Sequence, residues 1–537
     1  MRQFTSIAGL RRYLELHRFQ SDANLKRGGD RQDASHRQQT VGLVPTMGAL
    51  HAGHISLIRR ARLENHVVVV SIFVNPLQFA PNEDLQRYPR TPERDHQLCA
   101  EENVDVIFTP TPTELYGTSD ISNRDRLTQV IPPAEMMAVL CGRSRPGHFQ
   151  GVATVVTKLL SIVQPDRVYF GQKDAQQLAI LQRLVHDLNI PVEIVPCPIV
   201  RHESGLALSS RNDYLTIEEK ERATVLSRSL NQAKHAFSQG VRDRSDLLNT
   251  VKMELSTEPT VQVDYVDLVH PQTLAPLEQI NESGLLAIAV YLGSTRLIDN
   301  IVLRNRRPII AIDGPAGAGK STVARLVARK LDLLYLDSGA MYRAVTWLAL
   351  KSGLDIYDEP GIAELTSQCT IQIAQGEPEP DSPLPGLCRV WVNGHDVTHD
   401  IRSADVTAHV SAIAAQPAVR EELVKQQRNY GREGGVVMDG RDIGTHVFPH
   451  AELKIYLTAS VQERARRRQQ DLKDLGQPDE SLEDLERTIY QRDYRDSTRA
   501  IAPLRKAPDA VEIETDTLSV DDVVDAIIEL YASRCHH

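Results

Sequence analysis

The residues best suited to chemistry in this sequence form a glycine-rich run, Gly-Pro-Ala-Gly-Ala-Gly-Lys-Ser, at positions 314–321. This run matches the phosphate-binding pattern G-x-x-x-x-G-K-[ST] at every defined position. In that pattern, backbone N–H groups hold phosphate oxygens, while Lys320 would reach the terminal phosphates and Ser321 would hold Mg²⁺. The residues expected to contact the nucleotide are Gly314, Gly317, Gly319, Lys320, Ser321 and Thr322.

The surrounding sequence favours this interpretation over a glycine turn that happens to precede a helix. Residues 308–313 form a short apolar run, which predicts a buried strand. After the loop, apolar residues recur over 323–331 at the spacing of one helix face. This strand–loop–helix context predicts a nucleoside triphosphate site in the second half of the chain.

A second candidate site lies in the first half, where residues 51–54 read His-Ala-Gly-His. A strand that runs into a helix through this turn would place two imidazoles at a helix N-terminus, and Gly53 would let a nucleotide approach the backbone. The histidines could supply positive or hydrogen-bonding groups to a triphosphate attacked at its α-phosphorus. The pattern is short, and two solvent-exposed loop histidines fit it as well. A metal site is less favoured, because no carboxylate or third histidine accompanies the pair.

Several polar segments lie next to other predicted strands and helices of the first half. Their positions favour a single site shared with the histidine pair. These segments cover 73–79, 145–152, 171–177 and 208–212. Open α/β sheets bind ligands just outside the carboxyl ends of their strands. We therefore expect polar groups from these segments to gather near the histidine pair.

The second half carries a surplus of arginines close to predicted strand ends. Segments 336–343, 438–445 and 492–499 combine arginines with hydroxyl and carboxylate groups, and 463–468 is an arginine-dense helix. Phosphoryl transfer between two anionic substrates needs this much positive charge. For 463–468 alone, a solvated helix face is the simpler interpretation. The guanine-binding pattern N-K-x-D of GTPases is missing from the sequence.

Composition limits the class of protein. A chain of 537 residues predicts two to four domains. The sequence contains no run of eighteen apolar residues, so no membrane span is predicted. The net charge of -10, with both signs mixed along the chain, argues against a general nucleic-acid binder. The six cysteines are scattered without a C-x-x-C pair, and the first residues lack a signal-peptide core. Both features predict reduced thiols in a cytoplasmic protein.

The elements that must position these residues follow an alternation of strands and helices. Apolar runs at 41–45, 67–74 and 168–170 alternate with helical stretches, which predicts a parallel α/β sheet. A charged helical region and a few strands follow up to residue 292, and the basic segment 304–308 is the seam before a second α/β pattern. Residues 18–40 predict a mobile polar insertion, and 376–383 an acidic surface loop.

Taken together, the first-half motifs closely resemble pantothenate synthetase, the pantoate–β-alanine ligase family of H-x-G-H nucleotidyltransferases. The resemblance covers residues 1–303, apart from a polar insertion longer than the family usually carries. It implies a Rossmann-like nucleotide-binding domain over 1–200 and a smaller α+β subdomain over 201–303. It also implies attack of pantoate on ATP to form pantoyl adenylate, displacement of AMP by β-alanine, and a homodimer through this half.

The same resemblance implies roles for individual residues. His51 and His54 would stabilise charge on the phosphates, Met47 would lie near adenine, and Gln78 and Gln177 would bind pantoate. The remaining members of the ATP pocket would be Gly171, Lys173, Asp174, Ser209, Ser210 and Arg211, with Lys173 and Arg211 acting in catalysis. No covalent acyl-enzyme is expected.

The second-half motifs closely resemble bacterial cytidylate kinase over residues 308–537. The resemblance implies a P-loop nucleoside monophosphate kinase fold with a lid and a CMP-binding insert, the latter over 401–420. It also implies transfer of the γ-phosphate from Mg²⁺-bound ATP to CMP or dCMP, with Arg499 bridging the phosphates. The implied CMP site is Ser338, Arg343, Ser411, Arg420, Arg441, Asp442, Arg492 and Asp496.

Three functions remain open at this point. The first is a bifunctional enzyme with two independent active sites that share ATP and Mg²⁺ but no intermediate. The second is an enzyme in which one half is only a regulatory nucleotide-binding module, although neither half has lost its motif. The third is a different adenylate-forming ligase in the first half, which Gln78 and Gln177 argue against.

Overall fold

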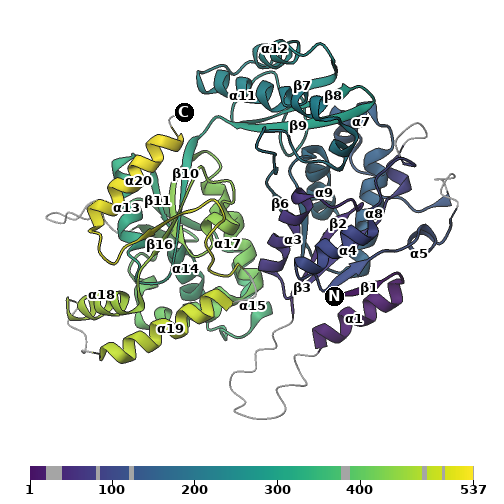
Figure 1. The fold of residues 1–537 in the computed structure, drawn as a ribbon. Coiled ribbons are helices and arrows are strands. Elements are labelled where there is room, and N and C mark those ends of the chain that lie inside the picture. The colour runs from purple at the N-terminus through teal and green to yellow at the C-terminus, as the bar shows by residue number, and fades with distance from the viewer. Residues whose placement is uncertain are drawn as a thin grey trace. The chain divides into compact units, whose positions relative to one another are not determined.

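The computed structural model describes residues 1–19, 39–79, 85–119, 126–376, 388–474, 480–498 and 502–535. Within it the chain divides into two compact units, Met1–Asn305 and Arg306–His537 (Figure 1). Arg499, with its predicted bridging role, lies outside the described residues. Most of the polar insertion and most of the acidic loop lie outside them as well. None of the helices in the described part of the chain combines the length and apolar character needed to cross a bilayer.

The first unit is built on a six-stranded parallel sheet with the strand order β1-β4-β3-β2-β5-β6. Its strands are β1 (Arg2–Phe4), β2 (Val41–Thr46), β3 (Val67–Ile72), β4 (Val106–Phe108), β5 (Arg167–Gly171) and β6 (Glu193–Cys197). Both faces of the sheet are covered, which explains why its strands read as continuous apolar runs. The predicted parallel α/β fold is confirmed.

Helices cover the two faces of this sheet. They are α1 (Ile7–Phe19), α3 (Ala52–Glu64), α4 (Pro92–Glu101), α5 (Pro112–Tyr116), α6 (Ala134–Met137), α7 (Leu140–Ser144), α8 (His148–Val163) and α9 (Ala175–Asp187). Successive strand residues alternate between the faces: Val69 packs in the core formed with α1, α8 and α9, whereas Val68 and Val70 pack in the core under α3 and α4.

The first unit ends in an antiparallel sheet with the order β7-β8-β9. The elements of this part are η4 (Ser210–Tyr214), α10 (Ile217–Arg222), α11 (Val225–Ser238), α12 (Arg244–Leu255), β7 (Val261–Val269), β8 (Ser283–Leu292) and β9 (Thr295–Arg304). One sheet face packs on α11 and α12, and the other contributes Tyr265 and Leu285 to the core of the parallel sheet. This is the smaller α+β part expected from the sequence.

The second unit is built on a five-stranded parallel sheet with the order β11-β15-β10-β16-β17. Its strands are β10 (Arg307–Asp313), β11 (Leu334–Asp337), β15 (Gly434–Gly440), β16 (Leu453–Thr458) and β17 (Val511–Glu514). The first strand is central, so the glycine-rich loop that follows it opens at the middle of the sheet edge. This arrangement confirms the second α/β pattern.

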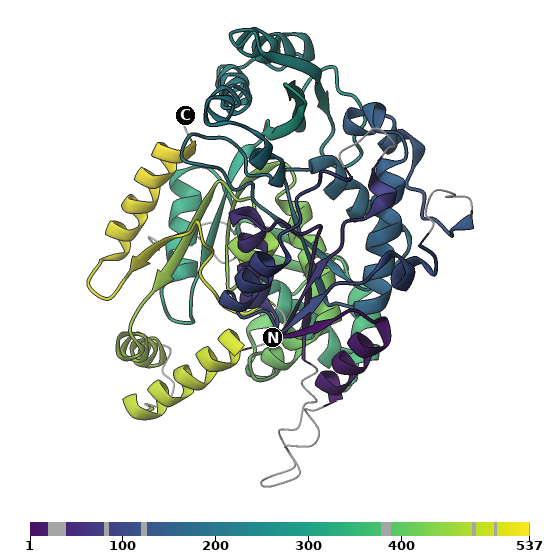
Figure 2. The ribbon, with the colours of Figure 1, turned by 45° about the vertical axis from the view of Figure 1, so that its right-hand side comes forward.

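Helices and a small insert complete the second unit. The helices are α13 (Lys320–Lys330), α14 (Ser338–Lys351), α15 (Glu359–Ser367), α16 (Ala404–Ala415), α17 (Pro417–Tyr430), α18 (Val461–Asp474), α19 (Leu482–Thr498) and α20 (Val520–Cys535). The insert contains the antiparallel strands β12 (Ile371–Ala374), β13 (Arg389–Val392) and β14 (His395–Asp396), followed by η5 (Asp400–Arg402). Helices α18 and α19 lie side by side at one end of the unit and share a small apolar cluster of their own (Figure 2).

Candidate active sites

The two histidines of the first unit form a capping box at the start of α3. His51 is the N-cap, and its Nδ1 accepts a hydrogen bond of 3.1 Å from the backbone N–H of Gly53. His54 Nδ1 accepts in turn from the backbone N–H of His51 at 3.4 Å, and the two ring centroids are 4.1 Å apart. Because each Nδ1 accepts from the backbone, each neutral ring carries its proton on Nε2. The pair therefore presents two N–H donors.

Both rings are uncharged at neutral pH. Burial, with the nearby charge of Lys173 as the next cause, lowers the pKa of His51 to about 4. Burial, followed by the effect of His51, lowers the pKa of His54 to about 3. The sequence allowed positive or hydrogen-bonding groups at these positions, and the pKa values favour neutral hydrogen-bond donors.

The turn before His51 is held by a buried carboxylate that the sequence did not identify. Asp95 on α4 accepts backbone N–H bonds from Ala49 at 2.9 Å and from Leu50 at 2.8 Å. Thr91 donates its hydroxyl to the same carboxylate at 3.0 Å. Ala49 lies at a φ of 50°, so the turn needs this support. No local pattern marks Asp95, because α4 reaches the turn only in the folded chain.

The predicted phosphate-binding segments lie close to this turn. The hydroxyl of Ser210 donates to the Ala49 carbonyl at 3.4 Å, and Ser209 caps η4 by accepting from the Arg211 N–H at 3.3 Å. The charge of Lys173 affects His51, and the charge of Arg211 affects Lys173. These side chains from distant segments thus form one group around the α3 N-terminus.

Strand β9 supports the loop that carries Lys173. Asn300 donates its side-chain N–H bonds to the carbonyls of Gln172 at 3.0 Å and Lys173 at 2.9 Å. Asp299 forms a two-pronged ion pair with Arg201 at 2.6 and 2.9 Å. Burial lowers the pKa of Lys173, and the charge of Asp299 opposes that effect. Sequence analysis missed Asn300 and Asp299 because their roles depend on contacts between distant segments.

The two glutamines expected to bind pantoate follow different strands of the same sheet. Gln78 ends η2 (Pro76–Gln78) after β3 and is buried, and its carbonyl accepts from His148 Nδ1 at 2.7 Å. Gln177 lies in the first turn of α9 after β5, where its backbone N–H donates to Asp174 at 3.0 Å. Asp174 is therefore a helix cap here, and its predicted contact with nucleotide stays a prediction, as do those of Met47 and Gly171. A Cβ at Gly171 would meet nothing within 4 Å.

In the second unit, the glycine-rich loop adopts a backbone that needs its glycines. Gly314, Gly317 and Gly319 have φ values of 149°, 79° and 83°. A Cβ on Gly314 would lie 2.0 Å from the carbonyl oxygen of Leu457. Lys320 is folded back onto the loop, where its Nζ donates to the Pro315 carbonyl at 2.7 Å. Burial lowers the pKa of this ammonium well below its usual value, so an anionic partner would stabilise its charged form.

A carboxylate missed by the sequence analysis faces the hydroxyl predicted to hold Mg²⁺. Ser321 Oγ donates to Asp439 Oδ2 at 2.6 Å, and the Tyr335 hydroxyl donates to the other oxygen at 2.9 Å. Asp439 follows the apolar run of β15, a signal that could have identified it. Hydroxyl and carboxylate oxygens beside a phosphate-binding loop are the donors that Mg²⁺ takes together with phosphates. The residues present therefore fit this ion.

The arginines expected to bind CMP are paired with acidic groups or crowd one another. Arg343 pairs with Asp337 at 2.7 Å. Two pairs join predicted site residues to each other: Arg420 with Asp442 at 2.5 Å, and Arg441 with Asp496 at 2.9 Å. Burial lowers the pKa of Arg492, and Arg441 lowers it further. Such crowding of cations favours an anionic ligand.

One further arginine and two predicted serines belong to this region. Arg402, within the predicted insert, is half-buried, and this partial burial, followed by the charge of Arg343, lowers the pKa of Arg402. Ser338 donates its hydroxyl to the Asp439 carbonyl at 2.6 Å, and Ser411 is exposed on α16. Both serines remain predicted CMP contacts.

The end of β10 is tied directly to the segment that carries Asp442. The carboxylate of Asp313 accepts the backbone N–H groups of Ile443 and Gly444, both at 2.7 Å. Burial raises the pKa of Asp313 to about 7, although these two bonds oppose the shift. Asp313 therefore joins the phosphate-binding loop to the predicted CMP-binding segment.

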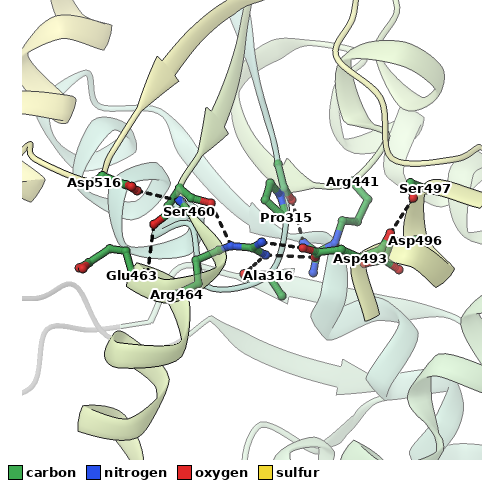
Figure 3. Close-up of polar contacts among 12 residues, drawn as sticks. Pro315, Ala316, Arg441, Ser460, Glu463, Arg464, Asp493, Asp496, Ser497 and Asp516 are labelled. Atoms are coloured by element: carbon green, nitrogen blue, oxygen red, sulfur yellow. Dashed lines mark hydrogen bonds and ion pairs between the residues drawn. The ribbon is translucent and has the colours of Figure 1, made fainter. Parts of the chain in front are cut away.

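The arginine-dense helix α18 is exposed only in part. The Arg466 side chain is 71% exposed and pairs with Glu463, as expected for a solvated face. Arg464 is 4% exposed and forms a two-pronged ion pair with Asp493 of α19, at 2.6 and 3.1 Å (Figure 3). It also donates to the Ala316 carbonyl of the glycine-rich loop at 3.2 Å. The solvated-face interpretation therefore holds for Arg466 and is wrong for Arg464.

Known proteins match both units in the same order. The family model for pantoate-beta-alanine ligase matches residues 19–302, and the model for cytidylate kinase matches residues 310–533. A protein of Trichormus variabilis named bifunctional pantoate ligase/cytidylate kinase is 59% identical over 99% of both chains. One of the same name from Trichodesmium erythraeum is 54% identical over 100% of this chain and 98% of its own.

Among solved structures, pantothenate synthetase from Thermus thermophilus aligns with 56% of this chain and 99% of its own, at 42% identity and a TM-score of 0.49. The two family models account for both units, and the relatives match almost the whole length of the chain. The chain belongs to the bifunctional pantoate ligase/cytidylate kinase family.

Proposed function

We propose that the chain catalyses two separate reactions, one in each unit. The first joins pantoate to β-alanine at the expense of ATP, with release of AMP and pyrophosphate. The second transfers the γ-phosphate of ATP to CMP or dCMP. The observation that carries this proposal is that each unit keeps its polar groups together: the capping-box histidines beside Lys173, and the intact phosphate-binding loop with the crowded arginines of its unit.

In the first unit, the pantoate carboxylate attacks the α-phosphorus of ATP. The Nε2–H groups of His51 and His54 donate to phosphate oxygens whose charge grows as pyrophosphate leaves. Lys173 and Arg211 add positive charge, and Ser209 and Ser210 hold the β- and γ-phosphates. The β-alanine amine then attacks the acyl carbon and AMP departs. Since the chemistry needs positioning and charge stabilisation, no side chain has to act as a nucleophile.

Gln78 and Gln177 are proposed to hold pantoate through their side-chain amides. Support comes from their placement after β3 and β5, at the sheet edge where parallel α/β proteins bind ligands. Gly171 leaves open space at the end of β5, where the nucleotide is proposed to bind with contacts from Met47 and Asp174.

In the second unit, Lys320 exchanges the Pro315 carbonyl for the β- and γ-phosphates of ATP. The CMP phosphate and base are held by the predicted CMP-site arginines, and the ribose hydroxyls by Asp442 and Asp496. The pairs that these two carboxylates form with Arg420 and Arg441 support this, because the same groups are already close to one another. Arg499 would bridge the two substrates during transfer.

Mg²⁺ is proposed as the metal ion of both reactions, bound together with ATP. In the second unit, Ser321 and Asp439 would hold it, and it would neutralise phosphate charge during transfer. We also propose a homodimer formed through the first unit and a cytoplasmic location. Cys99, Cys141, Cys197, Cys369 and Cys388 are buried and free, as is usual in a reducing compartment.

A paired assay of the purified full-length chain tests both activities. One reaction contains ATP, Mg²⁺, pantoate and β-alanine and is followed by AMP release; the other contains ATP, Mg²⁺ and CMP and is followed by ADP. Replacement of His51 by Ala should abolish only the first activity, and Lys320→Ala only the second. Absence of either activity from the wild-type chain would assign that unit to a regulatory binding role.

A further inference from the structure

Three consecutive carbonyls of the phosphate-binding loop each accept a hydrogen bond from a cationic side chain. Arg441 donates to Gly314 at 3.1 Å, Lys320 to Pro315 at 2.7 Å, and Arg464 to Ala316 at 3.2 Å. The conformation of the loop therefore depends on where these cations are held. Lys320 is part of the loop itself, whereas the two arginines come from other segments.

Both of these arginines are held by the same helix. Asp493 pairs with Arg464 and Asp496 pairs with Arg441, and the two aspartates are three residues apart on α19 (Figure 3). Residues at this spacing lie on the same helix face. One face of α19 thus reaches the loop at Gly314 and Ala316 through two aspartate–arginine pairs.

The two pairs differ in what they can do for a substrate. Arg441 and Asp496 are proposed CMP ligands, so CMP would change their contacts. In contrast, Arg464 is fully engaged by the protein: Nε donates to the Ala459 carbonyl at 3.1 Å, and both terminal nitrogens contact Asp493. Its Cβ lies 3.3 Å from where a Cβ on Gly317 would be, so the side chain also packs against the loop.

We propose that Arg464 and Asp493 are positioning residues of the kinase reaction, which tie the ATP-binding loop to α19 and so couple it to the CMP site on that helix. The inference rests on the proposed kinase activity. Binding of CMP at Arg441 and Asp496 moves or orders α19, and the Arg464–Asp493 pair carries that change to Ala316. The pair therefore matters for how ATP is held, and not for the affinity of CMP itself.

Substitutions that weaken the two-pronged Arg464–Asp493 ion pair, but keep most of the side-chain volume, test this role. Arg464→Lys cannot make the two-pronged contact, and Asp493→Asn keeps the shape but loses the charge. Matched controls are Arg466→Lys on α18, and Glu483→Gln at the exposed start of α19. The ligase activity of the same full-length chains shows that equal amounts of protein are compared, and the Tm of the second unit shows whether that unit is folded.

We expect Arg464→Lys and Asp493→Asn each to lower kcat/KM for ATP about tenfold, with the Kd of CMP in the absence of ATP within about twofold of wild type. The increase in affinity for a non-hydrolysable ATP analogue on addition of CMP, measured by calorimetry, should shrink in both variants. The double variant should be no worse than either single one, because both remove the same contact. Asp493→Glu, which keeps the carboxylate, should recover part of the loss.

Two results would overturn the inference while leaving the kinase assignment intact. One is that both variants match the Arg466→Lys and Glu483→Gln controls. The other is an equal loss of ATP and CMP affinity together with a lower Tm, which is the signature of a purely structural ion pair. A wild-type chain without kinase activity would instead refute the proposed function.

Discussion

His54 Nδ1 accepts the backbone N–H of His51, and this contact closes a helix capping box made of two imidazoles. The usual partner at this position is a carboxylate or amide. The imidazole of His54 accepts the same backbone hydrogen bond through Nδ1, and its Nε2–H stays available to donate to a ligand. The cap of α3 and the proposed phosphate-binding donors are therefore the same side chains.

The neutral state of the histidines predicts how stability depends on pH. In the unfolded chain both histidines take up protons near pH 6.5, whereas in the folded chain their pKa values are about 4 and 3. Between these values the unfolded state binds more protons, so the free energy of unfolding falls as pH falls from 6.5 towards 4. We expect this loss in the free energy of unfolding to be smaller in His54→Gln. At pH 5 the difference should be on the order of 1 kcal/mol after allowance for solvent screening.

Urea unfolding followed by circular dichroism at pH 7 and pH 5 measures this difference, and the ligase activity retained at each urea concentration assigns the transition to the first unit, because both tryptophans lie in the second unit. His186→Gln is the control, because His186 is an exposed histidine on α9. An identical pH slope in wild type and His54→Gln would show that His54 titrates normally in the folded chain.

Asp95→Asn is expected to impair only the ligase reaction. An amide can accept only through its oxygen, so one of the two N–H groups of Ala49 and Leu50 loses its acceptor, at a cost of about 1–3 kcal/mol. The turn before His51 should then move, and kcat for AMP release should fall at least about tenfold. The kinase assay on the same protein, and Glu93→Gln at the exposed start of α4, serve as controls. Unchanged ligase kinetics would contradict a positioning role for Asp95.

Gln78→Ala is expected to separate pantoate binding from ATP binding. The backbone carbonyl of Gln78 still accepts from His148 in this variant, so the local fold is kept while the side-chain amide is lost. KM for pantoate should rise about tenfold or more, with KM for ATP within about twofold. Equal increases in both constants would contradict the assignment of this side chain to pantoate.

The buried Asp313 predicts a pH dependence for the kinase reaction. Its pKa of about 7 means that protonation near neutral pH replaces one acceptor oxygen by a hydroxyl that faces an N–H group. The contact between the ATP loop and the segment carrying Asp442 should tighten as pH rises from 6 to 8, and kcat should rise with it. In Asp313→Asn this step should vanish, because the amide does not titrate. A profile of the same shape in both proteins would assign the titration to another group.

The local pattern of the sequence predicted the parallel α/β sheets and the phosphate-binding loop, whereas the chemistry of each unit was implied by the resemblance to two families. Apolar runs such as 309–312 become central strands because both faces of a parallel sheet are buried, and the glycines at 314, 317 and 319 are needed for positive φ angles wherever this loop is folded. Asp439 could have been identified in the same way, since it directly follows the apolar part of β15.

Tertiary structure decided everything that depends on burial or on contacts between distant segments. The sequence could not show that the histidines are neutral, because their pKa values follow from desolvation by the folded chain. Nor could it separate Arg464 from Arg466, two neighbours on one helix, of which only the first is buried against Asp493. A charge run has the same appearance in sequence whether its members face water or a loop, and only the packing of α18 on its neighbours distinguishes them.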